Sequence, residues 1–236
     1  VLMGPTGAPT PIHENRTVLV IAGSWGAAAM LGLGRRMREK GNRVLYVGAF
    51  GDPSQVYCQG ELEQVTDQII WASAGEALIE ARRPQDRSVH SSDVIDLLSR
   101  YHDGTLGAGQ GAGRDIALGD VDEILVMGSS RLLKGMQDAI SDRLQGVFRP
   151  DVEIQGTVGS PMQCMLKGVC AQCLQWQIDP ETGRRTKAVF SCAAQDQPLM
   201  WIDVDNLVAR QSQNRVQEHI TNLWVDHVLE QPEAGA

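Results

Sequence analysis

The chain has 236 residues, of which 42% are hydrophobic and 21% charged, and its formal net charge at pH 7 is −8. It is long enough for one large or two small globular domains, and no run of about 18 apolar residues marks a membrane span. The acidic balance, without a basic stripe of interleaved aromatic residues, excludes nucleic acid as an expected partner. An odd count of five cysteines and no apolar signal segment predict reduced thiols and a cytoplasmic protein.

The first two thirds of the sequence alternate between predicted strands and helices. Residues 17–22 are a continuous apolar, β-branched run, which is typical of a strand buried on both faces of a parallel sheet. A turn over residues 23–26, a helix over 27–40 and a second strand over 43–48 follow. This order predicts a βαβ unit.

The same alternation continues to about residue 150. The further predicted elements are a strand at 68–72, a helix at 91–101, a mobile glycine-rich surface loop at 103–114, a strand at 123–127 and a helix from Ser130 through Leu144.

Two of the predicted strands end in a glycine-containing turn that opens a helix, at Gly23 to Gly26 and at Gly128-Ser129. In an open parallel sheet such turns lie at the carboxyl edge, where helix N-termini favour an anion such as a dinucleotide pyrophosphate. The first turn has two glycines rather than the three of the dinucleotide fingerprint. A purely steric need for glycine at these turns therefore stays open.

Four of the five cysteines follow the spacing C-x5-C-x2-C-x18-C, and they are Cys164, Cys170, Cys173 and Cys192. A plant-type [2Fe–2S] loop has the spacing C-x4-C-x2-C with a distant fourth cysteine, one residue shorter in the first gap. A structural zinc site usually has two short-spaced pairs, and only one is present here. The spacing therefore favours a [2Fe–2S] cluster, with zinc as the open alternative.

The elements after residue 150 predict how the fourth cysteine reaches the others. A half-buried strand is predicted at 152–158, and strands at 174–178 and 188–191 flank a turn at 179–183. This hairpin would return Cys192 to the cysteine loop. A final helix over 206–230 has an apolar side that would cover the small domain or dock it onto the sheet.

These residues resemble the ferredoxin–NADP reductase superfamily, in its iron–sulfur branch. That branch includes the electron-transfer subunit of dihydroorotate dehydrogenase and the small subunit of NADH-dependent ferredoxin:NADP oxidoreductase, and the C-terminal part of glutamate-synthase-like flavoproteins is similar as well. The resemblance implies an α/β fold with three parts. These are a remnant of a preceding barrel at 1–14, an NAD(P)-binding-like open parallel sheet at 15–150, and a small [2Fe–2S] domain with a hairpin and C-terminal helix at 151–236.

The resemblance also implies roles for individual residues. It assigns the pyrophosphate-facing turn to Gly23, Ser24, Trp25 and Gly26, the nicotinamide-facing turn to Gly128 and Ser129, and the metal ligands to Cys164, Cys170, Cys173 and Cys192. Four positions depart from the family pattern: Trp25 is bulky, Ala29 replaces a proline, Met127 replaces a cysteine and Ser129 stands where the family has a proline. No catalytic protein side chain is implied, because the cofactors supply the reactivity.

The implied function is an electron-transfer module of an iron–sulfur flavoprotein oxidoreductase. NAD(P)H would reduce FAD held on a missing domain or on a partner subunit, and single electrons would leave through the [2Fe–2S] cluster. A flavin-bearing or catalytic partner implies a hetero-oligomer. Asp52, just past the second strand, favours NADH over NADPH if it faces the ribose. The alternatives are a non-catalytic metal-binding subunit that docks a larger complex, and a nucleotide-binding regulator with a zinc-stapled tail.

Overall fold

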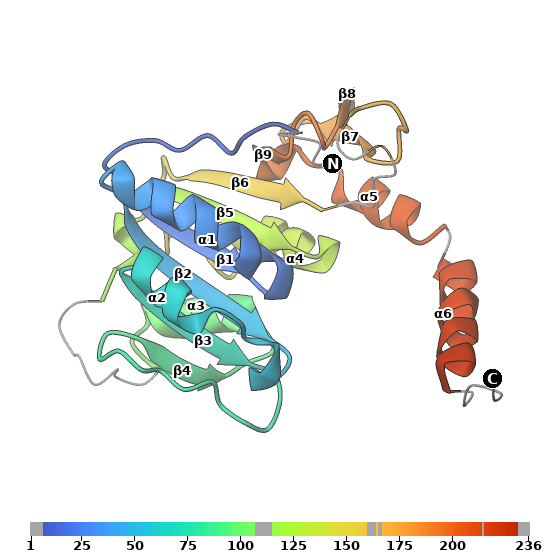
Figure 1. The fold of residues 1–236 in the computed structure, drawn as a ribbon. Coiled ribbons are helices and arrows are strands. Elements are labelled where there is room, and N and C mark those ends of the chain that lie inside the picture. The colour runs from blue at the N-terminus through green and yellow to red at the C-terminus, as the bar shows by residue number, and fades with distance from the viewer. Residues whose placement is uncertain (1–6, 107–114, 160–163, 165–166, 214, 231–236) are drawn as a thin grey trace.

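A seven-stranded sheet with helices on both faces forms the body of the molecule (Figure 1). The computed structural model describes residues 7–106, 115–159, 164, 167–213 and 215–230, and the side chains of residues 24, 25 and 215 are not described. The strand order is β4-β3-β2-β1-β5-β6-β9. Six of these strands are parallel: β1 (Thr17–Ala22), β2 (Arg43–Phe50), β3 (Gln68–Ser73), β4 (Arg87–His90), β5 (Glu123–Gly128) and β6 (Glu153–Val158). Only the short edge strand β9 (Asp196–Pro198) runs antiparallel.

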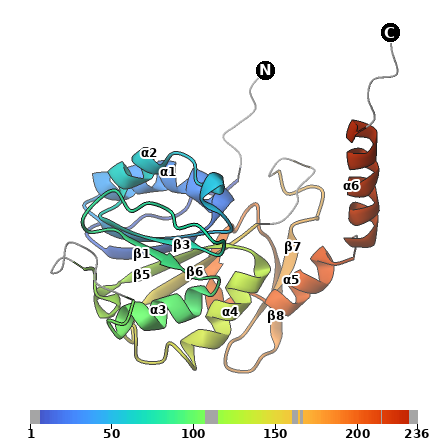
Figure 2. The same cartoon turned by 90° about the horizontal axis from the view of Figure 1, so that it is seen from below.

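Two pairs of helices cover the two faces of this sheet (Figure 2). On one face α1 (Ser24–Glu39) and α2 (Gln59–Val65) bury their apolar side chains against alternate residues of β1, among them Val18 and Val20. On the other face α3 (Val94–His102) and α4 (Ser130–Ile140) pack against the intervening residues Leu19 and Ile21. Because both faces are covered, the central strands are continuous apolar runs, as the sequence predicts.

A small antiparallel hairpin, β7 (Leu174–Ile178) with β8 (Arg185–Phe190), lies beside the sheet. A single bridge between Gln177 and Ile202 joins β7 to the chain after the 3-10 turn η3 (Leu199–Trp201). The helix α5 (Val204–Gln211) then contacts both α4 and β7. The hairpin is therefore anchored to the α4 side of the body.

The expected mixed α/β fold with a mostly parallel sheet is confirmed, with corrections to individual elements. α1 begins three residues earlier than predicted, α4 ends at Ile140 rather than near Leu144, and β8 begins at Arg185. Three short elements were not predicted, namely α2, β4 and β9. The sheet also continues past residue 150 through β6 and β9. The division into domains at that residue stays a prediction. Most of the predicted glycine-rich loop, residues 107–114, lies outside the described residues.

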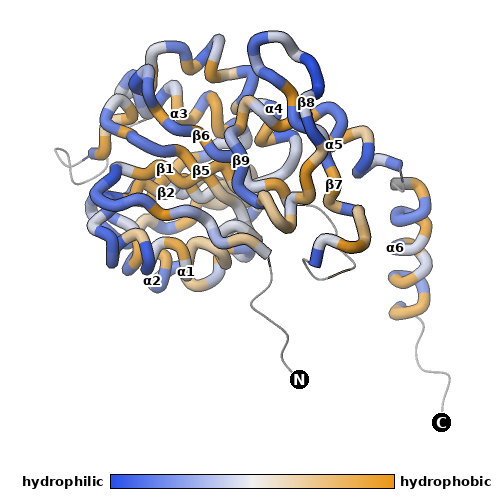
Figure 3. The backbone as a smooth tube through the Cα atoms, turned by 90° about the horizontal axis from the view of Figure 1, so that it is seen from above, coloured by the Kyte–Doolittle hydropathy of each residue, from blue (hydrophilic) through white to orange (hydrophobic). Residues whose placement is uncertain are grey.

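The single predicted helix at 206–230 is wrong, because the structure has α5 and then a separate α6 (Arg215–Glu230). The hydroxyl of Ser212 donates to the carbonyl of Ala209 at 2.9 Å, which competes with continuation of the helix. α6 stands away from the body (Figure 3). Its apolar side chains are exposed. These are Val216, Ile220, Leu223, Trp224, Val225, Val228 and Leu229.

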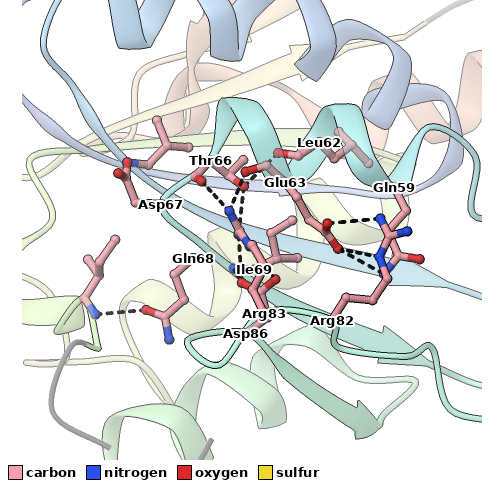
Figure 4. Close-up of polar contacts among 12 residues, drawn as sticks. Gln59, Leu62, Glu63, Thr66, Asp67, Gln68, Ile69, Arg82, Arg83 and Asp86 are labelled. Carbon is pink, nitrogen blue, oxygen red and sulfur yellow. Dashed lines mark hydrogen bonds and ion pairs between the residues drawn. The ribbon is translucent and has the colours of Figure 1, made fainter. Parts of the chain in front are cut away.

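A buried ion pair fixes the connection between β3 and β4 to α2 (Figure 4). The guanidinium of Arg83 makes two bonds of 2.8 Å to Asp86 and one of 2.9 Å to the carbonyl of Thr66. Asp86 also accepts from the N–H of Ile69 at 2.8 Å, and its side chain is fully buried. This network ties the connection to α2, in addition to Ile79 of the same segment, which is buried in the core beneath α1 and α2.

Candidate nucleotide pocket and cysteine site

A pocket of about 540 Å³ opens at the carboxyl edge of the sheet, between the ends of β1, β2 and β5. β1 and β5 are neighbours in the sheet although β2, β3 and β4 intervene in the chain. The strand order therefore changes direction between them, and open α/β sheets bind ligands at such a point. The pocket is lined by Gly23, Ala49, Phe50, Gly51, Gln55, Ser92, Asp93, Val94, Ile95, Gly128, Ser129, Arg131, Leu132 and Gly135.

Glycine is required in the turn between β1 and α1 for steric reasons. A Cβ on Gly23 would lie 2.7 Å from the carbonyl oxygen of Ala49 on β2. A Cβ on Gly26 would lie 2.6 Å from the Cβ of Ala22 and 3.3 Å from the carbonyl oxygen of Met127. All three distances from the added Cβ atoms are shorter than ordinary van der Waals contact. The two glycines therefore let α1 start directly against three strands.

The N-termini of three helices meet the pocket, and each is capped differently. No side chain among the described residues caps α1 at Gly23, so its first N–H groups stay available. Ser129 caps α4 by accepting from the N–H of Leu132 at 3.3 Å, and Asp93 caps α3. Burial opposes ionisation of Asp93, but bonds from Arg143 and from two backbone N–H groups outweigh it and lower the pKa of this carboxyl.

The structure brings three of the predicted nucleotide residues together, because Gly23, Gly128 and Ser129 all line the pocket. Gly26 is buried behind the pocket wall, and the side chains of Ser24 and Trp25 lie outside the described part. Their role in binding a nucleotide stays a prediction.

Asp52 does not line this pocket. Its carboxylate caps the 3-10 turn η1 (Pro53–Gln55) by accepting from the N–H of Ser54 at 2.9 Å, and the hydrogen bonds from Ser54 lower its pKa. The neighbouring Gln55 lines the pocket instead. The pocket residues from the end of β2 and the start of α3 were not predicted. A signal was available for the first group, because residues after a second parallel strand share the carboxyl edge with those after the first.

The hairpin places Cys173 and Cys192 side by side. Leu174 of β7 is paired with Phe190 of β8, and Ser191 donates from both its backbone N–H and its hydroxyl to the carbonyl of Cys173, at 3.1 and 2.8 Å. The thiols of Cys173 and Cys192 hydrogen bond to one another, and both residues are buried. Burial, followed by the neighbouring Cys173, raises the pKa of the Cys192 thiol.

The second pair of cysteines lies on the loop that precedes the hairpin. Cys164 accepts hydrogen bonds from the backbone N–H groups of Cys170, Val169 and Lys167, and also contacts the thiol of Cys170. These bonds, with that from Cys170 the strongest, lower the pKa of Cys164 to about 6. Cys192 accepts from the N–H of Gly168. The loop therefore points its N–H groups at sulfur atoms of both pairs.

Two left-handed residues and one helix hold this loop in shape. Gly168 has φ of 70° and Ala171 has φ of 58°, and a Cβ on Gly168 would lie 3.9 Å from the sulfur of Cys192. Arg210 of α5 donates to the carbonyls of Ala171 and Gln172 at 3.2 and 3.3 Å. The turn between Cys170 and Cys173 is thus tied to α5 through its backbone.

Within the described residues, no three His, Cys, Asp or Glu side chains gather in an arrangement that could hold one metal ion. Cys164 neighbours Cys170, Cys173 neighbours Cys192, and Cys164 is also close enough to Cys192 to contribute to the raised pKa of that thiol. The fifth cysteine, Cys58, is exposed at the start of α2 and does not belong to this arrangement. The metal ligands stay a prediction.

Comparison with known proteins places the fold but not the family. No family model matches the chain. An uncharacterized protein of Rickettsia prowazekii (strain Madrid E) is 24% identical over 222 residues, which cover 94% of this chain. The chain spans only 21%, about a fifth, of that relative's length.

Comparison with solved structures gives one match that shares the fold and a weaker, partial one. The structure of an NADH-dependent reduced ferredoxin–NADP oxidoreductase, described in connection with flavin-based electron bifurcation, is 18% identical with a TM-score of 0.66. The match covers 94% of this chain and 67% of the oxidoreductase chain, so the two proteins share a fold. The C-terminal domain of a hydrogenase from Pyrococcus furiosus is 19% identical over 62% of this chain and 98% of its own, with a TM-score of only 0.39. Among the described helices, none is long and apolar enough to cross a membrane.

Proposed function

We propose that this chain is an electron-transfer module of an oxidoreductase, with a [2Fe–2S] cluster on the four cysteines and a nicotinamide nucleotide in the carboxyl-edge pocket. The arrangement of the cysteines as two pairs on one loop and hairpin carries the proposal. The fold shared with an NADH-dependent reduced ferredoxin–NADP oxidoreductase supports it.

The pairing of the cysteines favours two iron atoms over one zinc ion. In a [2Fe–2S] cluster each iron takes two protein ligands, whereas a structural zinc ion takes four ligands around one centre. Cys164 with Cys170, and Cys173 with Cys192, fit the first requirement.

The surroundings of the sulfur atoms also fit a cluster of this kind. Ligand sulfurs bind metal as thiolates, and N–H groups directed at them stabilise the negative charge. The loop donates such N–H groups to Cys164 from Cys170, Val169 and Lys167, and to Cys192 from Gly168. When bound, a cluster here would supply one-electron chemistry.

The pocket at the carboxyl edge is suited to a nucleotide by its position and by its free helix N-terminus. The start of α1 presents N–H groups for a pyrophosphate, and Arg131 adds a positive charge to the pocket wall.

Since NAD(P)H gives up two electrons as hydride and a [2Fe–2S] cluster accepts one, a flavin must lie between them. FAD would be held on another segment or on a partner subunit. A partner subunit that carries the flavin would form a hetero-oligomer with this chain. Free thiols in a metal site suit the reducing cytoplasm.

Anaerobic reconstitution of the full chain with iron and sulfide tests the cluster. We expect a brown protein with two irons per chain, and an EPR signal from the unpaired electron after reduction with dithionite. A colourless protein that holds one zinc per chain would contradict the cluster. Titration with NADH and NADPH tests the pocket separately, and saturable binding is expected for at least one of them.

A second candidate function is that of a non-catalytic metal-binding subunit that docks a larger complex. The exposed apolar side chains of α6 favour it, and so does the replacement of the family cysteine by Met127. The nucleotide titration separates the two functions. A chain that takes up iron but binds neither NADH nor NADPH would fit the second candidate, with the sheet as a scaffold.

A further inference from the structure

The side chain of Gln175 is the least satisfied polar group in the part of the chain that the structure describes. It is only 1% exposed, and neither its amide nitrogen nor its amide oxygen has a hydrogen-bond partner there. Among the described residues it alone lacks partners at both ends of a buried side chain. Burying an unpaired amide is unfavourable, and native proteins avoid it unless the group has a ligand to meet.

Gln175 is the second residue of β7 and lies two residues after Cys173 in the chain. Gln175 and Gln177 are buried on one side of β7, and Cys173 lies in the turn immediately before this strand. All three are buried, whereas Trp176 on the opposite face is 39% exposed. Gln175 is therefore the buried glutamine nearer to Cys173 along the chain.

Gln177 provides a direct comparison, because it is the same residue type on the same strand and face. It is also buried, but its amide nitrogen donates to Gln197 at 2.7 Å, and Gln197 in turn donates to the carbonyl of Ala194 at 2.8 Å. The glutamine farther from Cys173 is therefore held by protein partners. The glutamine next to Cys173 is not.

We propose that the amide N–H of Gln175 donates a hydrogen bond to sulfur of the metal centre at Cys173 and so tunes the potential at which that centre takes up one electron. Thiolate sulfur only accepts, which suits an N–H group with no other partner. Reduction adds one electron to the centre and no proton. The donor therefore stabilises the more negative, reduced form. Gln175 is a positioning and tuning residue and not a ligand. This inference rests on the proposed function.

The test compares Gln175→Met with Gln177→Met in the full chain, each reconstituted anaerobically with iron and sulfide. Methionine keeps the unbranched shape of glutamine and removes the amide. The reduction potential is measured by an EPR-monitored titration with dithionite and mediators. The thermal midpoint of each metal-free protein is measured beside it.

For Gln175→Met we expect the reduction equilibrium to fall about tenfold, which is about 59 mV for one electron. The metal-free variant should be at least as stable as the wild type, because an unpaired buried amide has been removed. Gln177→Met should behave in the opposite way, with an unchanged potential and a lower thermal midpoint, because it leaves the amide oxygen of Gln197 without its donor.

A Gln175→Met protein with wild-type iron content and wild-type potential would overturn the inference, and so would an equal shift in Gln177→Met. If Gln175→Met takes up no iron, Gln175→Leu is the second variant. Failure of both to bind iron while the folded Gln177→Met protein does would support contact with the metal centre. Absence of iron from the wild type would instead be a failure of the proposed function, so the two failures are distinguishable.

Discussion

The carboxyl-edge pocket and the cysteine site are built in opposite ways. The pocket is formed by the ends of strands inside a sheet that is covered on both faces, and its shape follows from strand order and from close backbone contact at Gly23. The cysteine site rests on a two-stranded hairpin and a loop outside that sheet. There strand pairing, the bonds of Ser191 to Cys173 and the bonds of Arg210 to the loop carbonyls hold the segments together.

This difference predicts different responses to loss of a ligand. The pocket is bounded by apolar packing and needs no nucleotide to keep its shape. The cysteine site contains four free thiols and a buried amide at Gln175 that has no partner among the described residues. Metal binding should therefore stabilise the hairpin region, and nucleotide binding should change the sheet little.

The largest expected effect is loss of iron on removal of one ligand. Cys173→Ser should lose nearly all iron, because one of the two irons would be left with a single protein sulfur. Cys58→Ser is the matched control, since this exposed cysteine lies outside the paired arrangement and should leave iron content unchanged. Iron and sulfide are assayed per chain after anaerobic reconstitution. Equal iron in both variants would remove Cys173 from the ligand set.

The next effect concerns the stability of the sheet, measured in the metal-free protein. Asp86→Ala leaves Arg83 and the N–H of Ile69 without their buried partner, and should lower the free energy of unfolding by about 3–5 kcal/mol. Asp151→Ala, which breaks an exposed ion pair with Arg149, should have little effect. Urea denaturation of the metal-free proteins measures both. The folded Asp86→Ala protein should still take up wild-type iron, and its loss would show that the two regions are coupled.

The strands differ in how well the sequence predicts them. β1, β2, β3 and β5 are recognisable because burial on both faces of a sheet demands continuous apolar runs. β4 and β9 are short and polar, and they join the sheet through pairing with β3 and β6 rather than through a pattern of their own. Pro198 argues against a strand, because proline has no N–H group for strand pairing. It is tolerated in β9 because β9 is an edge strand.

The sites show the same division. Cysteine spacing is local, so the four candidate ligands can be named from the sequence, but the pocket walls at β2 and α3 require the strand order. β7 shows a further difficulty. Its alternation of Leu174, Trp176 and Ile178 with two glutamines suggests that the apolar side faces inward, yet the structure buries both glutamines and half-exposes Trp176. Gln177 has a polar partner from β9, which is distant in sequence and could not be anticipated.

A smaller effect tests the backbone contact that shapes the pocket. Gly23→Ala would place a Cβ 2.7 Å from the carbonyl oxygen of Ala49, and should cost about 1–3 kcal/mol of unfolding free energy. Gly32→Ala lies on the same helix with nothing within 4 Å of the new Cβ, and should stabilise the protein by about 0.5–1 kcal/mol. Denaturation and NADH titration of both variants decide whether Gly23 supports folding and nucleotide affinity together. Loss of affinity in Gly32→Ala as well would show that the glycines act through helix flexibility.

The smallest effect concerns the thiolate of Cys164 in the metal-free protein. Its N–H bonds, first from Cys170 and then from Val169, hold the pKa at about 6, so the reactive thiolate is lost only as the pH falls through that value. Its rate of alkylation by iodoacetamide should fall about tenfold between pH 8 and pH 5. In the urea-unfolded chain, where a thiol has a pKa of about 8.5, the rate should fall several hundredfold. Peptide mapping by mass spectrometry follows this residue, and a steep fall in the folded protein would show that the loop does not direct its N–H groups at Cys164 before metal binds.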